Sequence, residues 1–167
     1  MFIEATKLIH LPIAAVDTES KIGSIDNIII DPENGALMGF LVSTGGILSS
    51  KKVLSAVDIR DWDPNGIVTA SAENIVEIDD IVRIKEVVDN KIFLLGMPAK
   101  TEGGNGLGKV EDLLIDTDTQ AVAKYYLNDF AGNERVISAN NVVKIDKQVV
   151  FKDDVVEIPS GGQTAVA

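Results

Sequence analysis

The sequence of 167 residues lacks cysteine, has a single histidine and contains few aromatic residues. Because no thiol is present, disulfides, thiolate metal sites and cysteine nucleophiles are excluded. Basic residues are also in the minority, with 15 Lys and Arg against 26 Asp and Glu, and the net charge is −11. A field of that sign repels phosphate backbones, so we expect no direct binding to nucleic acid.

Long hydrophobic runs are missing as well. No stretch approaches the roughly 18 apolar residues of a membrane span, and Met1 to Leu8 lacks the basic start and apolar centre of a secretion signal. We therefore expect no membrane segment and a cytoplasmic location. Hydrophobic residues still make up 46% of the chain and aromatic residues only 5%, so Ile, Val and Leu, which favour strands, carry the apolar content.

What the chain does contain is an internal repeat. Ile22 to Asp31 recurs as Leu107 to Asp116 at a constant offset of 85 residues, and the match continues into the following turn and strand. Four pairs are identical in this region: Gly23 with Gly108, Ile30 with Ile115, Asp31 with Asp116, and Ala36 with Ala121. Two shorter blocks recur in the same order: Val53 to Ala56 as Val136 to Ala139, and Asn74 to Ile78 as Asp154 to Ile158. Ordered blocks of this kind predict a duplicated small domain.

The repeat divides the chain into four regions. Residues 1–79 are expected to form the first unit, residues 80–91 a linker, residues 92–158 the second unit and residues 159–167 a flexible tail. The linker is predicted to contain a short helix, because an aspartate stands at its start and apolar residues follow at helical spacing. The residues that carry this prediction are Asp79, Asp80, Ile81, Ile84, Val88 and Asn90.

Each unit is expected to be all-β. In the first unit a long strand over Lys21 to Ile30 precedes a turn at Asp31 to Gly35, where Pro and Asn-Gly favour chain reversal. The second unit repeats this hairpin around the turn Asp116 to Gln120. Many short strands separated by Gly, Pro and Asn favour a small barrel, so the sequence predicts two tandem small β-barrels joined by a short helix or linker.

The apolar alternation of the long strand slips once. Ile25 and Ile28 are three residues apart where a regular strand places like residues two apart, and Val110 and Leu113 repeat the slip. The pattern predicts a β-bulge near Asp26 in the first unit and at the equivalent position of the second. Such a bulge bends the strand in the way that closing a barrel requires.

The order of these features matches a known family. In the first unit, the strand Ile22 to Asp31 with its glycine precedes the Asp-Pro-Glu-x-Gly turn, the Gly-Gly loop Thr44 to Leu48 and a Val-x-Ser-Ala-x-Asp-Ile segment that starts at Val53. This unit resembles the PRC-barrel family, which includes barrels of the photosynthetic reaction centre H subunit and of a ribosome maturation factor. The resemblance implies compact β-barrels that work by binding other macromolecules, and it implies no catalytic residue and no cofactor.

The second unit resembles the family less closely. Gln120 stands in place of the turn glycine, and Asn128 to Asn133 replaces the Gly-Gly loop. The separate N-terminal barrel of the maturation factor and the membrane anchor of the H subunit are not evident in the sequence. Neither specialised role is therefore transferred from the family to this chain.

No catalytic constellation is visible in the sequence. A hydrolase or transferase needs a base beside a nucleophile, and the single histidine, His10, lies next to Pro12 at an expected strand edge. The serines occur in no Gly-x-Ser-x-Gly elbow. The sequence therefore indicates a protein without enzymatic activity.

The acidic turns raise the question of a metal site. They offer carboxylate, amide and hydroxyl oxygens at Asp31, Glu33 and Asn34, and again at Asp116, Asp118 and Thr119. The glycine and the bidentate glutamate that complete an EF-hand loop are missing. The same residue types are ordinary turn formers that bond to their own backbone, so we expect no bound metal.

Two loops remain as candidate partner-binding sites. Ile47 and Leu48 lie between two glycines and two serines, in a loop two residues longer than its counterpart, and Phe130 lies in the corresponding loop of the second unit. An apolar loop tip either contacts a partner or folds back onto the end of its barrel. The sequence leaves both alternatives open.

The function indicated by these features is a non-catalytic protein-interaction or assembly module. It would bind an unidentified protein partner, and exposed strand edges offer one route to a homodimer. The alternative is a factor in RNA processing or ribosome maturation that binds a ribosomal protein, which the resemblance to the maturation factor permits.

Overall fold

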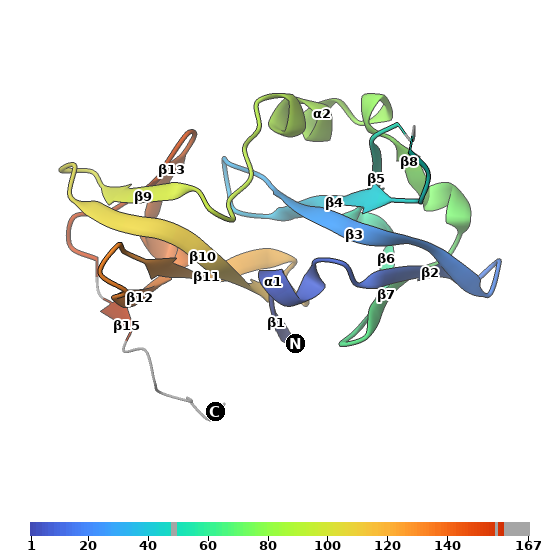
Figure 1. Cartoon of the computed structure of the whole chain (residues 1–167), viewed down its shortest axis with the longest axis horizontal. Helices are drawn as coiled ribbons and strands as arrows, with labels where there is room; N and C mark the ends of the chain where they lie inside the picture. Colours follow the sequence, from blue (N-terminus) through green and yellow to red (C-terminus); the bar gives the residue numbers. More distant parts are fainter. Residues whose placement is uncertain (48–49, 156, 159–167) are drawn as a thin grey trace.

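The computed structural model of the chain describes residues 1–47, 50–155 and 157–158. It confirms the all-β prediction, since the described chain consists mainly of strands arranged in two halves that lie side by side (Figure 1). Leu48 and the predicted tail, residues 159–167, lie outside the described residues.

The first half is one twisted sheet with strand order β6-β7-β2-β3-β4-β5-β8. Strands β2 and β7 run parallel, and the other neighbours in this order are antiparallel. The bounds of the strands are β2 (Pro12–Ala15), β3 (Ser20–Ile30), β4 (Leu37–Ser43), β5 (Lys52–Ser55), β6 (Ile59–Asp63), β7 (Gly66–Thr69) and β8 (Ile75–Glu77).

The second half repeats this topology strand for strand. Its order is β13-β14-β9-β10-β11-β12-β15, and β9 and β14 again form the parallel pair. The bounds are β9 (Pro98–Thr101), β10 (Gly106–Asp116), β11 (Ala121–Asn128), β12 (Glu134–Ser138), β13 (Val142–Ile145), β14 (Val149–Phe151) and β15 (Glu157–Ile158). The duplication read from the sequence is therefore a duplication of the fold.

The predicted β-bulges are present in both long strands. The pairing of β3 with β4 slips between Ile25 and Asn27, and that of β10 with β11 slips between Val110 and Asp112. At both bulges a side-chain oxygen accepts a hydrogen bond from the next backbone N–H, from Ile28 to Asn27 Oδ1 and from Leu113 to Asp112 Oδ1, each at 2.8 Å. The side chains of Asn27 and Asp112 thus provide hydrogen-bond acceptors for backbone N–H groups at the two bulges.

Helices are short and lie at connections. The α-helices are α1 (Ala5–Leu8) and α2 (Val82–Asp89), and the 3₁₀ turns are η1 (Ala56–Asp58), η2 (Ala72–Asn74), η3 (Ile78–Asp80) and η4 (Ala139–Asn141). Helix α2 lies in the connection between the halves and begins after Ile81, which caps it without a side-chain bond. An aspartate cap was predicted wrongly: η3 takes up both aspartates, because Ile81 N bonds Ile78 O at 3.2 Å.

The N-terminal strand β1 (Phe2–Glu4) crosses to the second half and pairs antiparallel with β10, where Ile3 lies opposite Ile115. The carbonyl of Met1 accepts hydrogen bonds from Thr117 N at 2.8 Å and from Thr117 Oγ1 at 2.9 Å. In the repeat, Thr117 occupies the position of Pro32, which has no N–H to donate. Residues assigned by sequence to the first unit therefore extend the sheet of the second.

The two halves also meet at their equivalent hairpin turns. Ala36 lies opposite Ala121 in an antiparallel bridge. Leu37 N donates to Gln120 O at 2.8 Å, and Val122 N donates to Gly35 O at 3.0 Å. Because these two bonds are repeat equivalents of each other, and Ala36 lies opposite its own repeat equivalent, the junction has local two-fold symmetry, and the chain resembles a dimer joined into one polypeptide.

The hydrophobic core is continuous across this junction. One cluster holds buried side chains of both halves, among them Phe40 and Tyr125 at equivalent positions. A second, smaller cluster lies under α2, where Ile84, Val87 and Val88 cover Ile29 and Val53 on the outer face of the first sheet. The halves are thus bonded at the turns, joined by β1 and packed on a common core.

Candidate interaction site

The first predicted partner-binding residue lies in the β4–β5 loop. Ile47 is fully exposed, and the preceding Gly45 and Gly46 have φ values of +83° and +106°, which favour glycine. The side chain of Ile47 does not fold back onto the barrel, which was the alternative for this residue. Leu48, the second predicted residue, lies outside the described residues.

Phe130 is also fully exposed, at the tip of the β11–β12 loop. This loop is held by Asp129, whose carboxylate accepts hydrogen bonds from Ala131 N, Asn133 N and Asn133 Nδ2, each at 2.9 Å. The Asn133 side chain, followed by these backbone bonds, lowers the pKa of the Asp129 carboxyl below its ordinary value. The network fixes the loop from within and leaves the aromatic ring of Phe130 in solvent.

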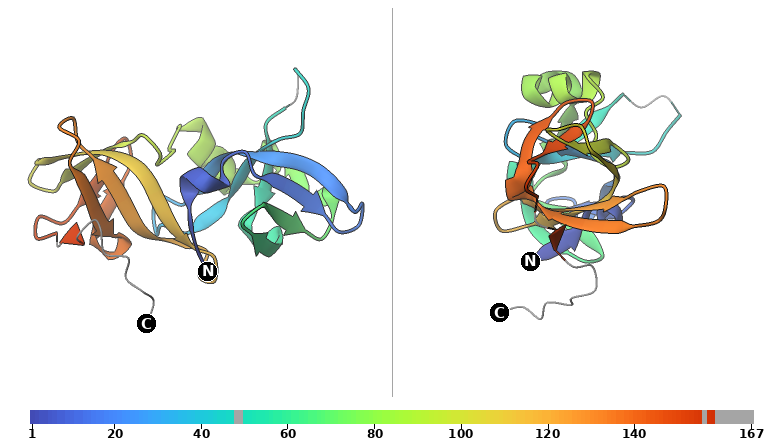
Figure 2. Two further views of the ribbon diagram at one scale, coloured as in Figure 1. Left: turned by 60° about the horizontal axis from the view of Figure 1, so that its bottom comes forward. Right: turned by 90° about the vertical axis from the view of Figure 1, so that its left-hand side faces the viewer.

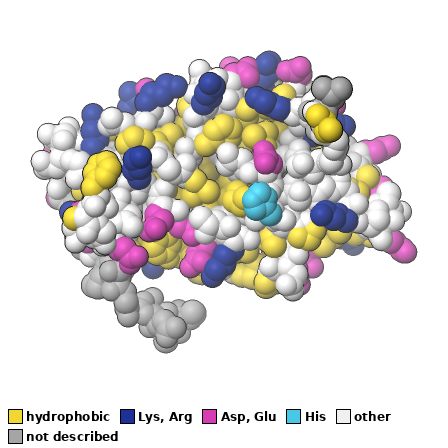
Figure 3. All heavy atoms as spheres, in the orientation of Figure 1, with side chains coloured by type: hydrophobic (Ala, Val, Ile, Leu, Met, Phe, Trp, Pro, Cys, Tyr) yellow, Lys and Arg dark blue, Asp and Glu magenta, His cyan; other side chains and the backbone are white. Residues whose placement is uncertain are grey.

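The two loops project from the same side of the molecule, one from each half, in both views of Figure 2. On the face of Figure 3, hydrophobic side chains gather across the middle, between the halves, while Lys and Arg are interspersed with acidic side chains. This face shows no continuous basic stripe of the kind that tracks a phosphate backbone.

The candidate catalytic histidine, His10, has no hydrogen-bonded acid or nucleophile beside it among the described residues. His10 is exposed and has a φ of +70°, and its backbone N–H donates to Ile25 O at 2.8 Å. Among the described residues, no side chain hydrogen-bonds its imidazole. The described chain also brings together no group of three or more His, Asp or Glu side chains able to hold a metal.

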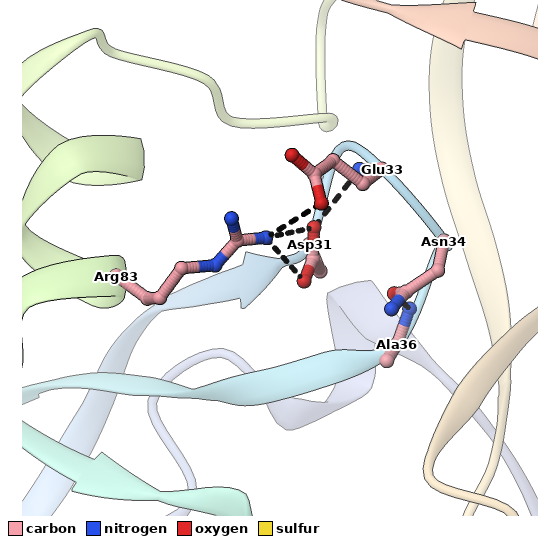
Figure 4. Close-up of polar contacts among 5 residues, drawn as sticks. All are labelled: Asp31, Glu33, Asn34, Ala36 and Arg83. Carbon is pink, nitrogen blue, oxygen red and sulfur yellow. Dashed lines mark hydrogen bonds and ion pairs between the residues drawn. The ribbon is translucent and has the colours of Figure 1, made fainter.

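The acidic turns are occupied by contacts within the protein. In the first turn, Arg83 Nη2 from α2 donates to both carboxylate oxygens of Asp31, at 2.9 and 2.8 Å, and lies 3.3 Å from Glu33 (Figure 4). Asp31 is 8% exposed, so little water reaches its carboxylate, and the arginine balances its charge. The hydrogen bonds that the Arg83 guanidinium donates to Asp31 and then to Glu33 raise its pKa.

In the second turn no arginine among the described residues is bonded to the equivalent Asp116. Asp116 Oδ1 accepts the backbone N–H of Asp118 at 3.0 Å, and this bond lowers the pKa of the Asp116 carboxyl. Asp118 in turn pairs with the amino group of Met1 at 3.2 Å. The equivalent acidic turns therefore fasten different segments, α2 in one half and the N-terminus in the other.

A cleft lies beside the junction of the turns. It has a volume of about 110 Å³ and separates the first hairpin turn from the second half. Its lining residues are Pro32, Glu33, Asn34, Gly35, Tyr125, Ala139, Val142, Val143, Lys144 and Ile145. No pattern in the sequence indicates this cleft, because its two walls are far apart in the chain and meet only through the pairing of the turns.

None of the helices in the described residues is long and apolar enough to cross a membrane. No curated protein matches the chain. The family model of the PRC-barrel domain matches residues 1–91, which is more than half of the chain and covers the first sheet together with α2. By this match and by its strand arrangement, the chain belongs to the PRC-barrel family.

Proposed function

We propose that the chain is a non-catalytic protein-interaction or assembly module of the cytoplasm, built from two PRC-type barrels. The observation that carries the proposal is the pair of fully exposed apolar tips, Ile47 and Phe130, on equivalent loops that project from one side of the molecule. Two exposed apolar side chains on one side of a protein offer a partner two anchor points, and burying such anchors provides much of the binding energy of protein interfaces.

The energetics of the two tips support a contact at two points. Moving an exposed Ile or Phe side chain into an apolar pocket stabilises a complex by about 1.5–3 kcal/mol before ordering costs. When both tips bind one partner, the second contact forms without a new loss of translational freedom. The net charge of −11 favours a partner whose surface around the pockets is basic.

A homodimer is one form that this interaction can take. In the described chain, β6 and β8 end the first sheet, and β13 and β15 end the second. Strands at sheet ends carry backbone groups that can pair with another chain. The absence of an acid partner for His10 among the described residues supports a binding role without catalysis.

The test is affinity purification from the native cell with the full chain and with an Ile47→Asp, Phe130→Asp double variant. The double variant should lose the partner, or should lose self-association in light scattering, while its far-UV spectrum stays unchanged. Val82→Asp is the matched control, because Val82 is exposed at the start of α2, where an acid is tolerated. Equal recovery of partners and equal mass for all three proteins would refute the proposal.

The same purification addresses the alternative role. Recovery of a ribosomal protein that depends on Ile47 and Phe130 would assign the module to ribosome maturation. Recovery of other proteins would place it in a different assembly.

A further inference from the structure

The two-fold junction creates two equivalent positions beside the hairpin turns, and they are filled differently. At one of them the side chain of Gln120 reaches the first half, where its Nε2 donates to the carbonyl of Ala56 at 2.9 Å. The repeat equivalents of Gln120 and Ala56 are Gly35 and Ala139. Ala56 and Ala139 each open a 3₁₀ turn, η1 and η4, so the two carbonyls have the same backbone setting.

The cleft is the equivalent position without its glutamine. Gly35 has no side chain to place there, and it lies in the wall of the cleft together with Ala139. A Cβ added to Gly35 would meet no atom within 4 Å, so the space beside it is open. The φ of +74° at Gly35 is close to the +50° that Gln120 itself adopts.

Two polar groups on the walls of the cleft have capacity for further hydrogen bonds. The carbonyl of Ala139 accepts one bond, from Val142 N, and a carbonyl oxygen has a second lone pair. Tyr125 is 1% exposed, and its ring packs edge-on against Phe151 at 5.4 Å between centroids. Within the described part of the chain, no residue hydrogen-bonds the Tyr125 hydroxyl. The hydroxyl oxygen is not fully enclosed, so it can donate a hydrogen bond to a ligand in the cleft.

The first half has no such hydroxyl at the equivalent position. Phe40 is the repeat equivalent of Tyr125, and it belongs to the position where the side chain of Gln120 bonds to Ala56. Burial raises the pKa of the Tyr125 hydroxyl, which therefore stays protonated and able to donate. The open side thus adds a hydroxyl donor, Tyr125, to the carbonyl acceptor Ala139, whereas the filled side has the equivalent carbonyl and no such hydroxyl.

We propose that the cleft binds a primary carboxamide, the group carried by a glutamine side chain, and that Gln120 is its internal counterpart. The amide oxygen accepts from the Tyr125 hydroxyl, and the amide NH₂ donates to the Ala139 carbonyl. The apolar chain leading to the amide lies against Val142 and Ile145. Glu33 and Lys144 oppose each other in charge around the cleft, so a neutral group suits it better than an ion of either sign.

This inference goes beyond the function proposed above, because the cleft involves neither Ile47 nor Phe130. Its glutamine can arrive on a partner protein, or the amide can be a free small molecule. A short peptide with one central glutamine and an N-methylamide end distinguishes these two sources. Binding by this peptide, but not by the same peptide with methionine in place of glutamine, would indicate a glutamine on a protein. Binding of the small amide alone would indicate a free ligand.

The first experiment is an NMR titration of the full chain with propionamide. We expect saturable shifts of backbone amides limited to residues 33–35, 125 and 139–145. Butanone has the same shape without the donor, and propionate carries a charge in place of the amide; both should bind at least tenfold more weakly. No saturable shift with propionamide, or equal shifts with butanone, would overturn the proposal.

The second experiment fills the cleft from within. Gly35→Gln should place its own carboxamide against Ala139 and abolish propionamide binding. Gly104→Gln is the matched control, since Gly104 also has a positive φ, +90°, and open space at its Cβ, and it should bind as the parent does. Tyr125→Phe should weaken binding roughly three- to tenfold, the worth of one neutral hydrogen bond. Unchanged binding by Gly35→Gln with a folded spectrum would contradict the assignment.

Discussion

The two halves share a topology but differ in what covers their sheets. In the first half α2 packs Ile84 over Ile29 and Val53 and closes the outer face of the sheet. The equivalent residues of the second half are Leu114 and Val136; Leu114 lies opposite Glu4 of β1, which extends the sheet beside β10 and does not pack on its face. The two halves have therefore kept the same interior and the same junction of the turns, while the elements added to each sheet, α2 in the first half and β1 in the second, differ.

The hairpin turns diverge in the same way. Pro32 and Gly35 give the first turn its shape. Gly35 bonds to the second half through its backbone carbonyl, which accepts from Val122 N. Thr117 and Gln120, at the same positions, bind Met1 and Ala56 through their side chains. Equivalent backbones thus support different attachments, and the difference can be tested residue by residue.

The largest effect is expected from removing the cover of the first sheet. Ile84→Ala should lower the free energy of unfolding by about 2–5 kcal/mol, because Ile84 is 2% exposed and its loss leaves a cavity under α2. Urea unfolding followed by the fluorescence of Trp62, whose ring packs on Phe40, measures it. Val82→Ala in the same helix, where the side chain is 70% exposed, should change stability by less than about 0.5 kcal/mol. Equal effects would show that α2 does not cover the sheet in solution.

The next effect concerns the ion pair that fastens α2. Arg83→Met should lower the free energy of unfolding, since it leaves the Asp31 carboxylate buried without its cation. The loss should be smaller than that of Ile84→Ala, because Arg83 is about half exposed and solvent screens the pair.

Asp31→Asn provides the control for this ion pair. A double-mutant cycle should show that Arg83→Met costs little once Asp31 is neutral. Losses that simply add would mean that Arg83 acts through its packing alone.

A smaller effect is expected at the filled side of the junction. Gln120→Met keeps a side chain of similar length and the positive φ, but it removes the bond to Ala56 O, so stability should fall by about 1 kcal/mol. Thermal unfolding measures the change, with Gln148→Met as a control at a residue whose side chain makes no hydrogen bond within the described chain. A loss at Gln148 as large as that at Gln120 would contradict a role for the carboxamide.

The smallest effect is expected from pH, which should change the β11–β12 loop and leave the β4–β5 loop unchanged. Because its pKa is lowered, the Asp129 carboxylate should support the β11–β12 loop at and above its ordinary pKa of 3.8. This support should be lost only as the pH falls through the lowered folded-state value. Amide shifts of Ala131 and Asn133, observed by NMR, should titrate below pH 3.8, while Gly45 in the other loop stays constant. Titration of Ala131 at or above the ordinary value would refute the bonded loop.

The sequence predicted the parts of the fold that depend on local pattern. A slip in apolar alternation located both bulges, and Asp-Pro-Glu-Asn-Gly located the first hairpin turn, because sterics and side-chain bonds within a few residues determine these features. The repeat itself predicted that the second half would copy the first. The exposure of Ile47 and Phe130 agrees with the loops chosen as candidates, although their binding role is still a prediction.

The identical pairs of the repeat show what the pattern alone could not explain. A Cβ on Gly23 would lie 2.7 Å from Val42 Cγ1, and one on Gly108 would lie 2.2 Å from Asn128 O, so a neighbouring strand excludes any side chain at both. Ala36 and Ala121 face each other across the junction. These reasons lie in contacts between residues distant in sequence, which one chain without its structure does not reveal.

Distance along the chain also hid the cleft and the pairing of β1. Tyr125 and Gly35 come together only after the two turns have met, and no local signal marks a tyrosine that lacks a hydrogen-bond partner. The capping error at α2 has a local cause instead: two consecutive aspartates fit a 3₁₀ turn as well as a helix start, and in this chain both lie in η3, before the helix begins.

The crossing of β1 has a consequence for how the molecule is made. A ribosome synthesises Phe2 to Glu4 first, but their partners in the sheet, Leu114 to Asp116, emerge only after most of the chain has been synthesised. Phe2 to Glu4 must therefore stay unpaired until those partners have been synthesised, and this closure is a contact of very long sequence separation, the kind that slows folding. The first sheet does not depend on it, because its seven strands lie within residues 12–77; it is the second sheet that is completed by a strand made long before it.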